Sequence, residues 1–141
     1  MVRVFMMLLI ASGLLLSACQ QSASTEVQGE KVDVPDGSYT DVSVTELETM
    51  IKNKDFTLVN VHIPYAGDIP ETDLSIPYNE IDQNLEQLPV DKNAKIVLYC
   101  QSDRMSTIAS ETLVGLGYTN VYNLDGGMAD WQRAELNLDQ R

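Results

Sequence analysis

Apolar residues along the chain alternate between short continuous runs and helix-like spacings. Residues 56–61 and 96–99 are short runs, rich in β-branched residues and bounded by polar positions, which predict buried strands. Residues 105–116 place their apolar side chains on one face of a helix, which Gly115 and Gly117 end. Because strands that alternate with helices form parallel sheets, the pattern predicts an α/β fold: a small parallel sheet with helices on both faces.

Weaker patterns predict the shorter elements. A short edge strand or an extended lead-in to the domain is expected at residues 42–44, and two more strands are expected at residues 74–78 and 120–124. Ser43 and Glu46 have the spacing of a capping box, which predicts that a short amphipathic helix begins there. Apolar residues at positions 81, 85 and 88 predict another helix before Pro89. A tight turn at residues 126–127 is expected to lead into a last helix.

Cys100 is placed where a predicted strand ends and a predicted helix begins. The first amides of a helix have no partner within the helix and lie at the positive end of its dipole, so they stabilise an anion. The thiolate is the nucleophilic form of cysteine. The position therefore predicts a reactive thiol that could hold its sulfur as an anion.

Two stretches resemble a known family. Residues 100–106, Cys-Gln-Ser-Asp-Arg-Met-Ser, resemble the active-site loop of single-domain rhodaneses, and residues 116–131 resemble the C-terminal signature of that family. The similarity covers roughly residues 41–132, with both motifs in the expected order. It implies a rhodanese-like domain over residues 41–141 that acts as an enzyme, a sulfurtransferase.

The resemblance also implies the chemistry of the site. Cys100 is expected to take a sulfane sulfur from a small donor, hold it as a persulfide and pass it to a thiol or a cyanide-like acceptor, with no cofactor and no metal. The other residues expected to surround the sulfur are Gln101, Ser102, Asp103, Arg104, Met105 and Ser106. Arg104 could bind anionic oxygens or lie on the surface, and the two serines could bind substrate, although capping of the helix is the simpler interpretation.

Several positions depart from the family pattern. Asp103 stands where glycine is common, and Gln101 and Ser102 are uncharged where members that use thiosulfate often carry basic residues. Polysulfide or a persulfide therefore fits as donor at least as well as thiosulfate. Residues 60–62, Asn-Val-His, replace Asp-Val-Arg, and residues 67–72 are a changed form of Gly-His-Ile-Pro-Gly-Ala. His62, the single histidine, is interpreted as structural.

The first residues have the pattern of an export signal. Residues 1–18 combine Arg3 with an apolar run too short to span a membrane, and residues 16–19, Leu-Ser-Ala-Cys, resemble a bacterial lipobox. This predicts an exported protein, anchored to a membrane through lipid on Cys19 and facing the periplasm or the cell exterior. An ordinary signal peptide, leaving Cys19 as a free thiol, is the alternative. Residues 19–40 show no apolar periodicity and predict a flexible tether.

Charge and residue types limit the other functions. The formal net charge of −12 disfavours nucleic acid as a partner. One histidine and one available cysteine do not make a structural zinc site. A cysteine phosphatase needs an arginine six residues after its cysteine, where this chain has Ser106. The open alternative to an enzyme is a rhodanese-fold module that binds a partner or senses redox state.

Overall fold

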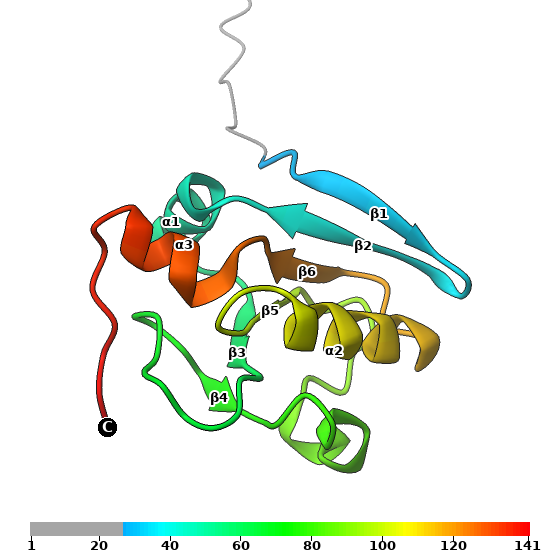
Figure 1. Ribbon diagram of the computed structural model, residues 1–141. Helices are drawn as coiled ribbons and strands as arrows, with labels where there is room; N and C mark the ends of the chain where they lie inside the picture. The colour runs from blue at the N-terminus through cyan, green and yellow to red at the C-terminus, as the bar shows by residue number, and fades with distance from the viewer. Residues whose placement is uncertain (1–26) are drawn as a thin grey trace, which may run out of the picture.

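A six-stranded sheet forms the centre of the protein (Figure 1). The computed structural model describes residues 27–141. The strand order is β1-β2-β6-β5-β3-β4; only β1 and β2 pair antiparallel. The strands are β1 (Glu30–Val34), β2 (Gly37–Val42), β3 (Thr57–Asn60), β4 (Leu74–Ser75), β5 (Ile96–Tyr99) and β6 (Val121–Leu124).

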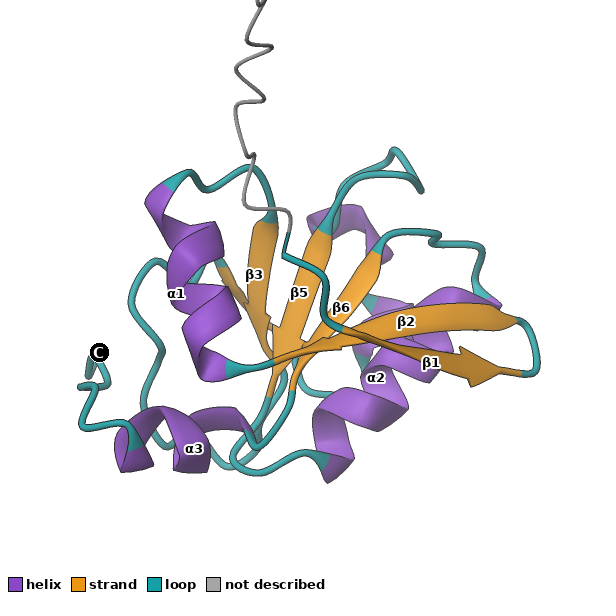
Figure 2. Ribbon diagram, turned by 90° about the horizontal axis from the view of Figure 1, so that it is seen from above, coloured by secondary structure: helices purple, strands orange, loops and turns teal. Residues whose placement is uncertain are grey.

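Helices cover both faces of this sheet (Figure 2). α1 (Val44–Lys52) and α3 (Gly127–Arg133) pack on one face, where Leu47, Met128 and their neighbours form one hydrophobic cluster. α2 (Arg104–Gly115) covers the other face, where a second cluster includes Leu113. The predicted α/β class, a parallel sheet with helices on both faces, is therefore confirmed, with one antiparallel strand added at its edge.

Local sequence signals placed several boundaries well. The helix predicted at residues 105–116 is α2, whose bounds differ by one residue at each end. The capping box is confirmed: Ser43 Oγ accepts a hydrogen bond from the amide of Glu46 at 3.3 Å, and Glu46 Oε2 accepts one from the amide of Ser43 at 2.8 Å. A cap of this kind is worth about 1 kcal/mol.

The predicted tether is wrong for residues 30–40, which form β1 and most of β2. Val32 and Val34 pack against the core, Tyr39 is buried, and a turn at Pro35 and Asp36 joins the two strands. The apolar residues alternate with polar ones, as in a strand with one covered face. β2 lies between β1 and β6, so residues 42–44 do not form the predicted edge strand. The signal peptide, Cys19 and the tether up to residue 26 lie outside the described residues; within residues 27–141, no helix is long and apolar enough to cross a membrane.

The helix predicted before Pro89 is also wrong. Its place is taken by two short 3₁₀ turns, Ile81–Gln83 and Leu85–Gln87, which still bury Ile81 and Leu88. Asn84 has a non-helical φ of −124° between the turns, and neither turn begins with a side-chain cap. Leu88 is extended because the proline that follows disfavours helical backbone.

Candidate active site

Cys100 lies directly after β5, at the carboxyl edge of the parallel strands, as predicted (Figure 1). Its side chain is only 1% exposed. Ser106 Oγ, one turn into α2, lies 3.4 Å from Cys100 Sγ and 2.9 Å from the carbonyl oxygen of Asp103. Because a hydroxyl has one proton, it donates to one of these acceptors at a time. Ser106 can therefore turn its proton toward the sulfur when the sulfur becomes an anion.

The beginning of α2 faces the same loop. The first backbone hydrogen bond of this turn runs from the amide of Thr107 to the carbonyl of Asp103 at 3.0 Å. The amides that precede Thr107 have no acceptor within the helix, which is the ordinary condition of a helix N-terminus. Unpaired amides and the helix dipole together favour negative charge on a sulfur at Cys100.

The N-terminus of α3 holds the loop from the other side. The amide of Met128 donates to the carbonyl of Cys100 at 2.9 Å, and the amide of Ala129 donates to the carbonyl of Gln101 at 2.8 Å. Gly127 permits this approach: it has a φ of +55°, and a Cβ atom there would lie 2.3 Å from the carbonyl oxygen of Cys100. The two stretches that resemble the family thus meet in one structure.

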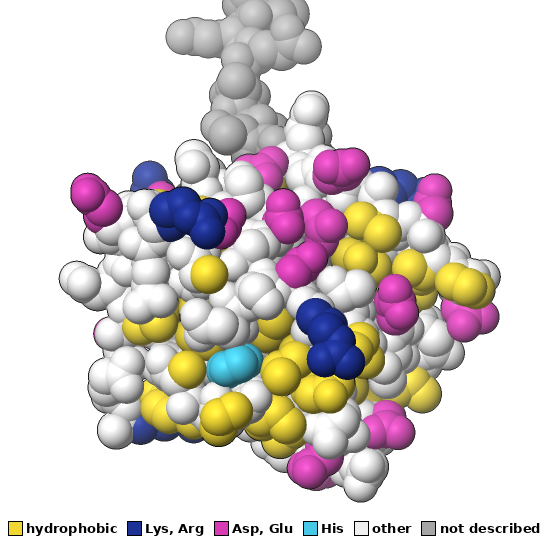
Figure 3. Space-filling view, viewed as in Figure 1, with side chains coloured by type: hydrophobic (Ala, Val, Ile, Leu, Met, Phe, Trp, Pro, Cys, Tyr) yellow, Lys and Arg dark blue, Asp and Glu magenta, His cyan; other side chains and the backbone are white. Residues whose placement is uncertain are grey.

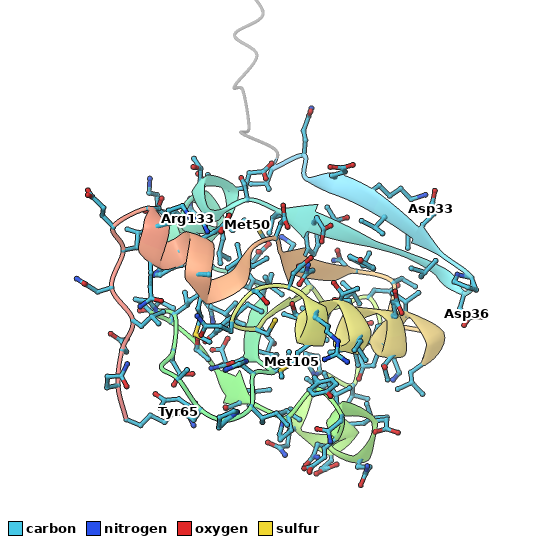
Figure 4. All side chains as sticks on the ribbon, viewed as in Figure 1. Asp33, Asp36, Met50, Tyr65, Met105 and Arg133 are labelled. Atoms are coloured by element: carbon cyan, nitrogen blue, oxygen red, sulfur yellow. The ribbon has the colours of Figure 1, made fainter. Side chains whose placement is uncertain are left out.

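The remaining predicted loop residues differ in exposure. Gln101 and Met105 are half-buried, and Met105 packs against the core beneath α2 (Figure 4). Ser102 and Arg104 are exposed. Arg104 makes no ion pair with any residue of the described part of the chain. Its guanidinium is therefore available to a bound anion.

The capping interpretation of Ser102 and Ser106 is wrong, because the N-cap position of α2 is Asp103. The Asp103 side chain does not cap the helix either, and its φ of −171° is extended backbone open to any residue. Instead Asp103 Oδ1 accepts a hydrogen bond at 2.9 Å from Nδ2 of Asn123, and the same Nδ2 donates to Asp41 Oδ1 at 2.8 Å. Burial raises the pKa of Asp41, and the nearby charge of Asp103 raises it further.

A second polar cluster lies beside the loop, at the end of β3. Asn60 is fully buried; its Nδ2 donates to Asp68 Oδ1 at 2.9 Å and its Oδ1 accepts from the amide of His62 at 3.0 Å. Asp68 accepts from four donors: Asn60 Nδ2, Tyr65 Oη at 3.2 Å, Tyr99 Oη at 3.4 Å and Arg141 Nε at 2.7 Å. Two positions that depart from the family pattern therefore bind each other, an amide donor to a carboxylate.

The geometry of this loop agrees with a comparison to known families. The model of the rhodanese-like domain matches residues 43–134. The chain belongs to the rhodanese-like domain family. This confirms the resemblance of the loop and the signature.

Curated relatives and solved structures are consistent with that membership. The domain is 32% identical over 94 residues to a sulfurtransferase of Allochromatium vinosum, covering 64% of this chain and 85% of the relative. It is 32% identical over 74 residues to a thiosulfate sulfurtransferase of Escherichia coli, covering 51% and 70%. A rhodanese-related protein of Thermoplasma volcanium has a similar structure, with a TM-score of 0.61, 25% identity and coverage of 71% and 97%. The named relatives support a general role in sulfur transfer.

His62 stands at the carboxyl end of β3 in this rhodanese-like domain. Burial lowers the pKa of its ring, and Nδ1 is buried without a hydrogen-bond partner among the described residues. The single histidine of the chain lies among hydrophobic side chains on the face shown in Figure 3. These surroundings favour the neutral form of the ring. The interpretation of His62 as a structural residue remains a prediction.

Sequence reasoning missed Asn123, Asp41 and the pairing of Asn60 with Asp68. One signal was present for Asn60 and Asn123: each is a polar residue inside a predicted strand, and such a residue needs a partner once the strand is covered. Asp41 lay outside the predicted strands and gave no such signal. The identity of that partner depends on which strands are neighbours, and the residue pattern does not define the strand order. Within residues 27–141, no group of His, Cys, Asp and Glu side chains is arranged to hold a metal ion.

Proposed function

We propose that this protein is an exported, lipid-anchored sulfurtransferase or persulfide carrier in which Cys100 accepts a sulfane sulfur. The observation that carries the proposal is the placement of Cys100 Sγ: it lies at the start of α2, 3.4 Å from the Ser106 hydroxyl, in a loop whose carbonyls are bound by α3. Relatives named sulfurtransferases support the same chemistry.

The reaction consists of two exchanges at sulfur. The Cys100 thiolate attacks the outer sulfur of the donor; the donor's sulfur–sulfur bond breaks, and its remaining part leaves with the electron pair. Cys100 then carries a persulfide whose negative charge is on the terminal sulfur. An acceptor thiolate attacks that terminal sulfur and restores the Cys100 thiolate. The Ser106 hydroxyl and the first amides of α2 stabilise the anionic sulfur throughout.

The charges around the loop bear on the donor. Asp103 and Asp41 place two carboxylates beside the loop, whereas Arg104 is the one cation within it. Thiosulfate would bring a dianion into these surroundings, and a persulfide of low charge would be repelled less. We therefore expect a persulfide of low charge to act faster than thiosulfate.

The start of the domain bears on how the anchor would work. If Cys19 carries lipid, residues 20–29 connect the membrane surface to β1, which begins at Glu30. Ten residues span at most about 35 Å when fully extended. The anchored site would then work close to the membrane and take its sulfur from a donor at that surface.

Intact mass spectrometry of the purified protein tests the proposal. Incubation with polysulfide or cysteine persulfide is expected to add the mass of one sulfur atom, which cyanide removes again, and thiosulfate is expected to add it more slowly than cysteine persulfide does. Cys100→Ser should gain nothing. If the folded protein, with a thiol that can be titrated, gains no sulfur from any donor, a module that binds a partner or senses redox state becomes the better assignment.

The role of the Ser106 hydroxyl can be separated from its place in the helix. Ser106→Ala is expected to slow the addition of sulfur to Cys100 about tenfold, since a hydrogen bond to a charged group is worth about 1.5–3 kcal/mol. Ser110→Ala is the matched control: Ser110 is buried one turn further along α2, and its hydroxyl has no hydrogen-bond partner within the described residues. Equal rates in the two variants would remove Ser106 from the mechanism.

A further inference from the structure

A buried amide in β6 joins three segments that are far apart in the sequence. Asn123 has no exposed surface. Its Nδ2 donates to Asp41 Oδ1 on β2 at 2.8 Å and to Asp103 Oδ1 in the Cys100 loop at 2.9 Å. Asp41 and Asn123 are also register partners in the sheet, so the backbone already fixes one end of this contact. The other end reaches a loop that belongs to no strand.

Asp103 and Ser106 connect Asn123 to the sulfur of Cys100. Asp103 uses its carboxylate for Asn123 and its carbonyl for the Ser106 hydroxyl, at 2.9 Å in both cases. Ser106 Oγ in turn lies 3.4 Å from Cys100 Sγ. Three consecutive hydrogen-bond contacts thus connect the interior of the sheet to the thiol. A displacement of Asp103 would move the acceptor that competes with the sulfur for the Ser106 proton.

We propose that Asn123 is the positioning residue of the loop formed by residues 100–103. Its side-chain amide binds Asp103 in this loop and Asp41 on β2 at the same time, and this fixes Ser106 and Cys100 relative to each other. Its consequence for sulfur transfer rests on the proposed function. Its consequence for the exposure of the thiol does not, which allows the two proposals to fail separately.

The electrostatics of the cluster explain why an amide is needed. Asp41 faces the carboxylates of Asp103 on the loop, Asp125 after β6 and Glu30 on β1. Figure 3 shows acidic side chains gathered over the ends of β2 and β6. Without a donor between them, Asp41 and Asp103 would repel each other and move the loop away from the sheet. An amide has two N–H groups and can bind both carboxylates at once.

Asn123→Asp removes the donor, and Asn120→Asp is its control. Asn120 lies just before β6 at the opposite edge of the sheet, where its Nδ2 donates to the carbonyl of Asn93. Both variants add one negative charge near the same strand. We expect Asn123→Asp to raise the rate of Cys100 alkylation by iodoacetamide about tenfold and to slow the addition of sulfur by a similar factor, whereas Asn120→Asp changes both rates less than twofold.

The triple variant D41N/D103N/N123D tests position directly. It exchanges the donor and both acceptors of the cluster, so that a carboxylate on β6 lies between two amides and can again bind the loop to the sheet. A return of Cys100 alkylation to the slow rate of the natural protein is expected from this exchange and not from a general loss of packing. If the Asn123→Asp protein does not fold, Asp103→Ala removes the same contact from the loop side and is expected to raise alkylation equally.

The outcomes separate the two proposals. If folded Asn123→Asp and Asp103→Ala both alkylate at the rate of Asn120→Asp, or if the triple exchange does not restore the slow rate, Asn123 does not position the loop. If alkylation changes as expected while no variant and no donor adds sulfur to Cys100, the positioning role stands and the sulfurtransferase proposal fails.

Discussion

The two polar clusters beside Cys100 are built in opposite ways. In one, a single amide, that of Asn123, serves two carboxylates, Asp41 and Asp103. In the other, a single carboxylate, that of Asp68, accepts hydrogen bonds from four donors, among them Asn60 and Tyr99. The first cluster therefore has an excess of negative charge, and the second has its charge satisfied.

The difference indicates that one cluster stabilises the fold and the other adjusts the reactivity of Cys100. A carboxylate that is mostly buried and fully hydrogen-bonded costs a great deal to disturb, so the Asp68 cluster mainly holds the loop after β3 to the sheet. Asp41 and Asp103 share one donor and repel each other, so a small change at Asn123 is enough to shift the loop that carries Cys100. We therefore expect substitutions at Asp68 to lower the free energy of unfolding and substitutions around Asn123 to change the reactivity of Cys100.

The largest expected effect is that of Asp68→Ala. The side chain of Asp68 is only 10% exposed, and its removal leaves one N–H of the buried Asn60 amide without an acceptor and Arg141 without its ion pair. We expect the free energy of unfolding, measured by urea denaturation, to fall by about 3 kcal/mol. Asp33→Ala removes a carboxylate from an exposed ion pair with Lys31 and should cost less than about 0.5 kcal/mol. A similar small loss for both variants would contradict the assignment of Asp68 as the stabilising member.

Gly127→Ala tests the contact that lies between the two clusters. The added Cβ would lie 2.3 Å from the carbonyl oxygen of Cys100, at a φ of +55°. We expect a loss of about 2 kcal/mol in urea denaturation and faster alkylation of Cys100, because the loop must move to make room. Gly117 also has a positive φ, +90°, but has open space around its Cβ position, so Gly117→Ala should cost only about 1 kcal/mol. Equal losses would mean that backbone strain, and not the clash with the loop, determines the cost.

The same contrast shows what could be predicted from the sequence. The segments that bear the chemistry are local: a strand, Cys100, a short loop and α2 follow one another, and the pattern of residues 96–116 predicts them nearly to the residue. The contact of α3 with the Cys100 carbonyl could not be predicted from periodicity, because it joins residues 28 positions apart through backbone atoms. Only the resemblance indicated that the two motifs belong together.

Other features depend on neighbours that the sequence pattern does not name. The hairpin of residues 30–42 contains only a few apolar residues, and residues 30–40 were interpreted as part of the tether; the hairpin is stabilised by pairing with β6, which lies about 80 residues further along the chain. The turns at residues 81–87 have helical spacing, but Asn84 and the proline after Leu88 interrupt the helix. For the turns the apolar positions were predicted correctly and the backbone between them was not, whereas for residues 30–40 neither was predicted.

The smallest expected effect is that of Asp41→Asn. Replacement of aspartate by asparagine should raise the free energy of unfolding in the Asn123 cluster and lower it in the Asp68 cluster. Burial, together with the charge of Asp103, raises the pKa of Asp41, so the folded protein binds this proton more tightly than the unfolded chain does. The stability that this group contributes is present at low pH and is lost as the pH rises through the raised pKa. Asp41→Asn should therefore raise the free energy of unfolding at pH 7, by less than about 1 kcal/mol because the group is partly exposed to solvent, and the gain should vanish near pH 3. Its new side chain keeps an oxygen that can accept from Asn123. Asp68→Asn should instead lower the free energy of unfolding at pH 7, since it loses the charge that pairs with Arg141 and puts an N–H group in place of one of the two oxygens that accept from four donors. Urea denaturation of both variants at the two pH values, with Asp36→Asn in the exposed hairpin turn as control, measures the signs. A lower free energy of unfolding for Asp41→Asn at pH 7 would show that Asn123 satisfies both carboxylates. The two clusters would then differ in how donors and acceptors are arranged, but not in whether their negative charge is satisfied.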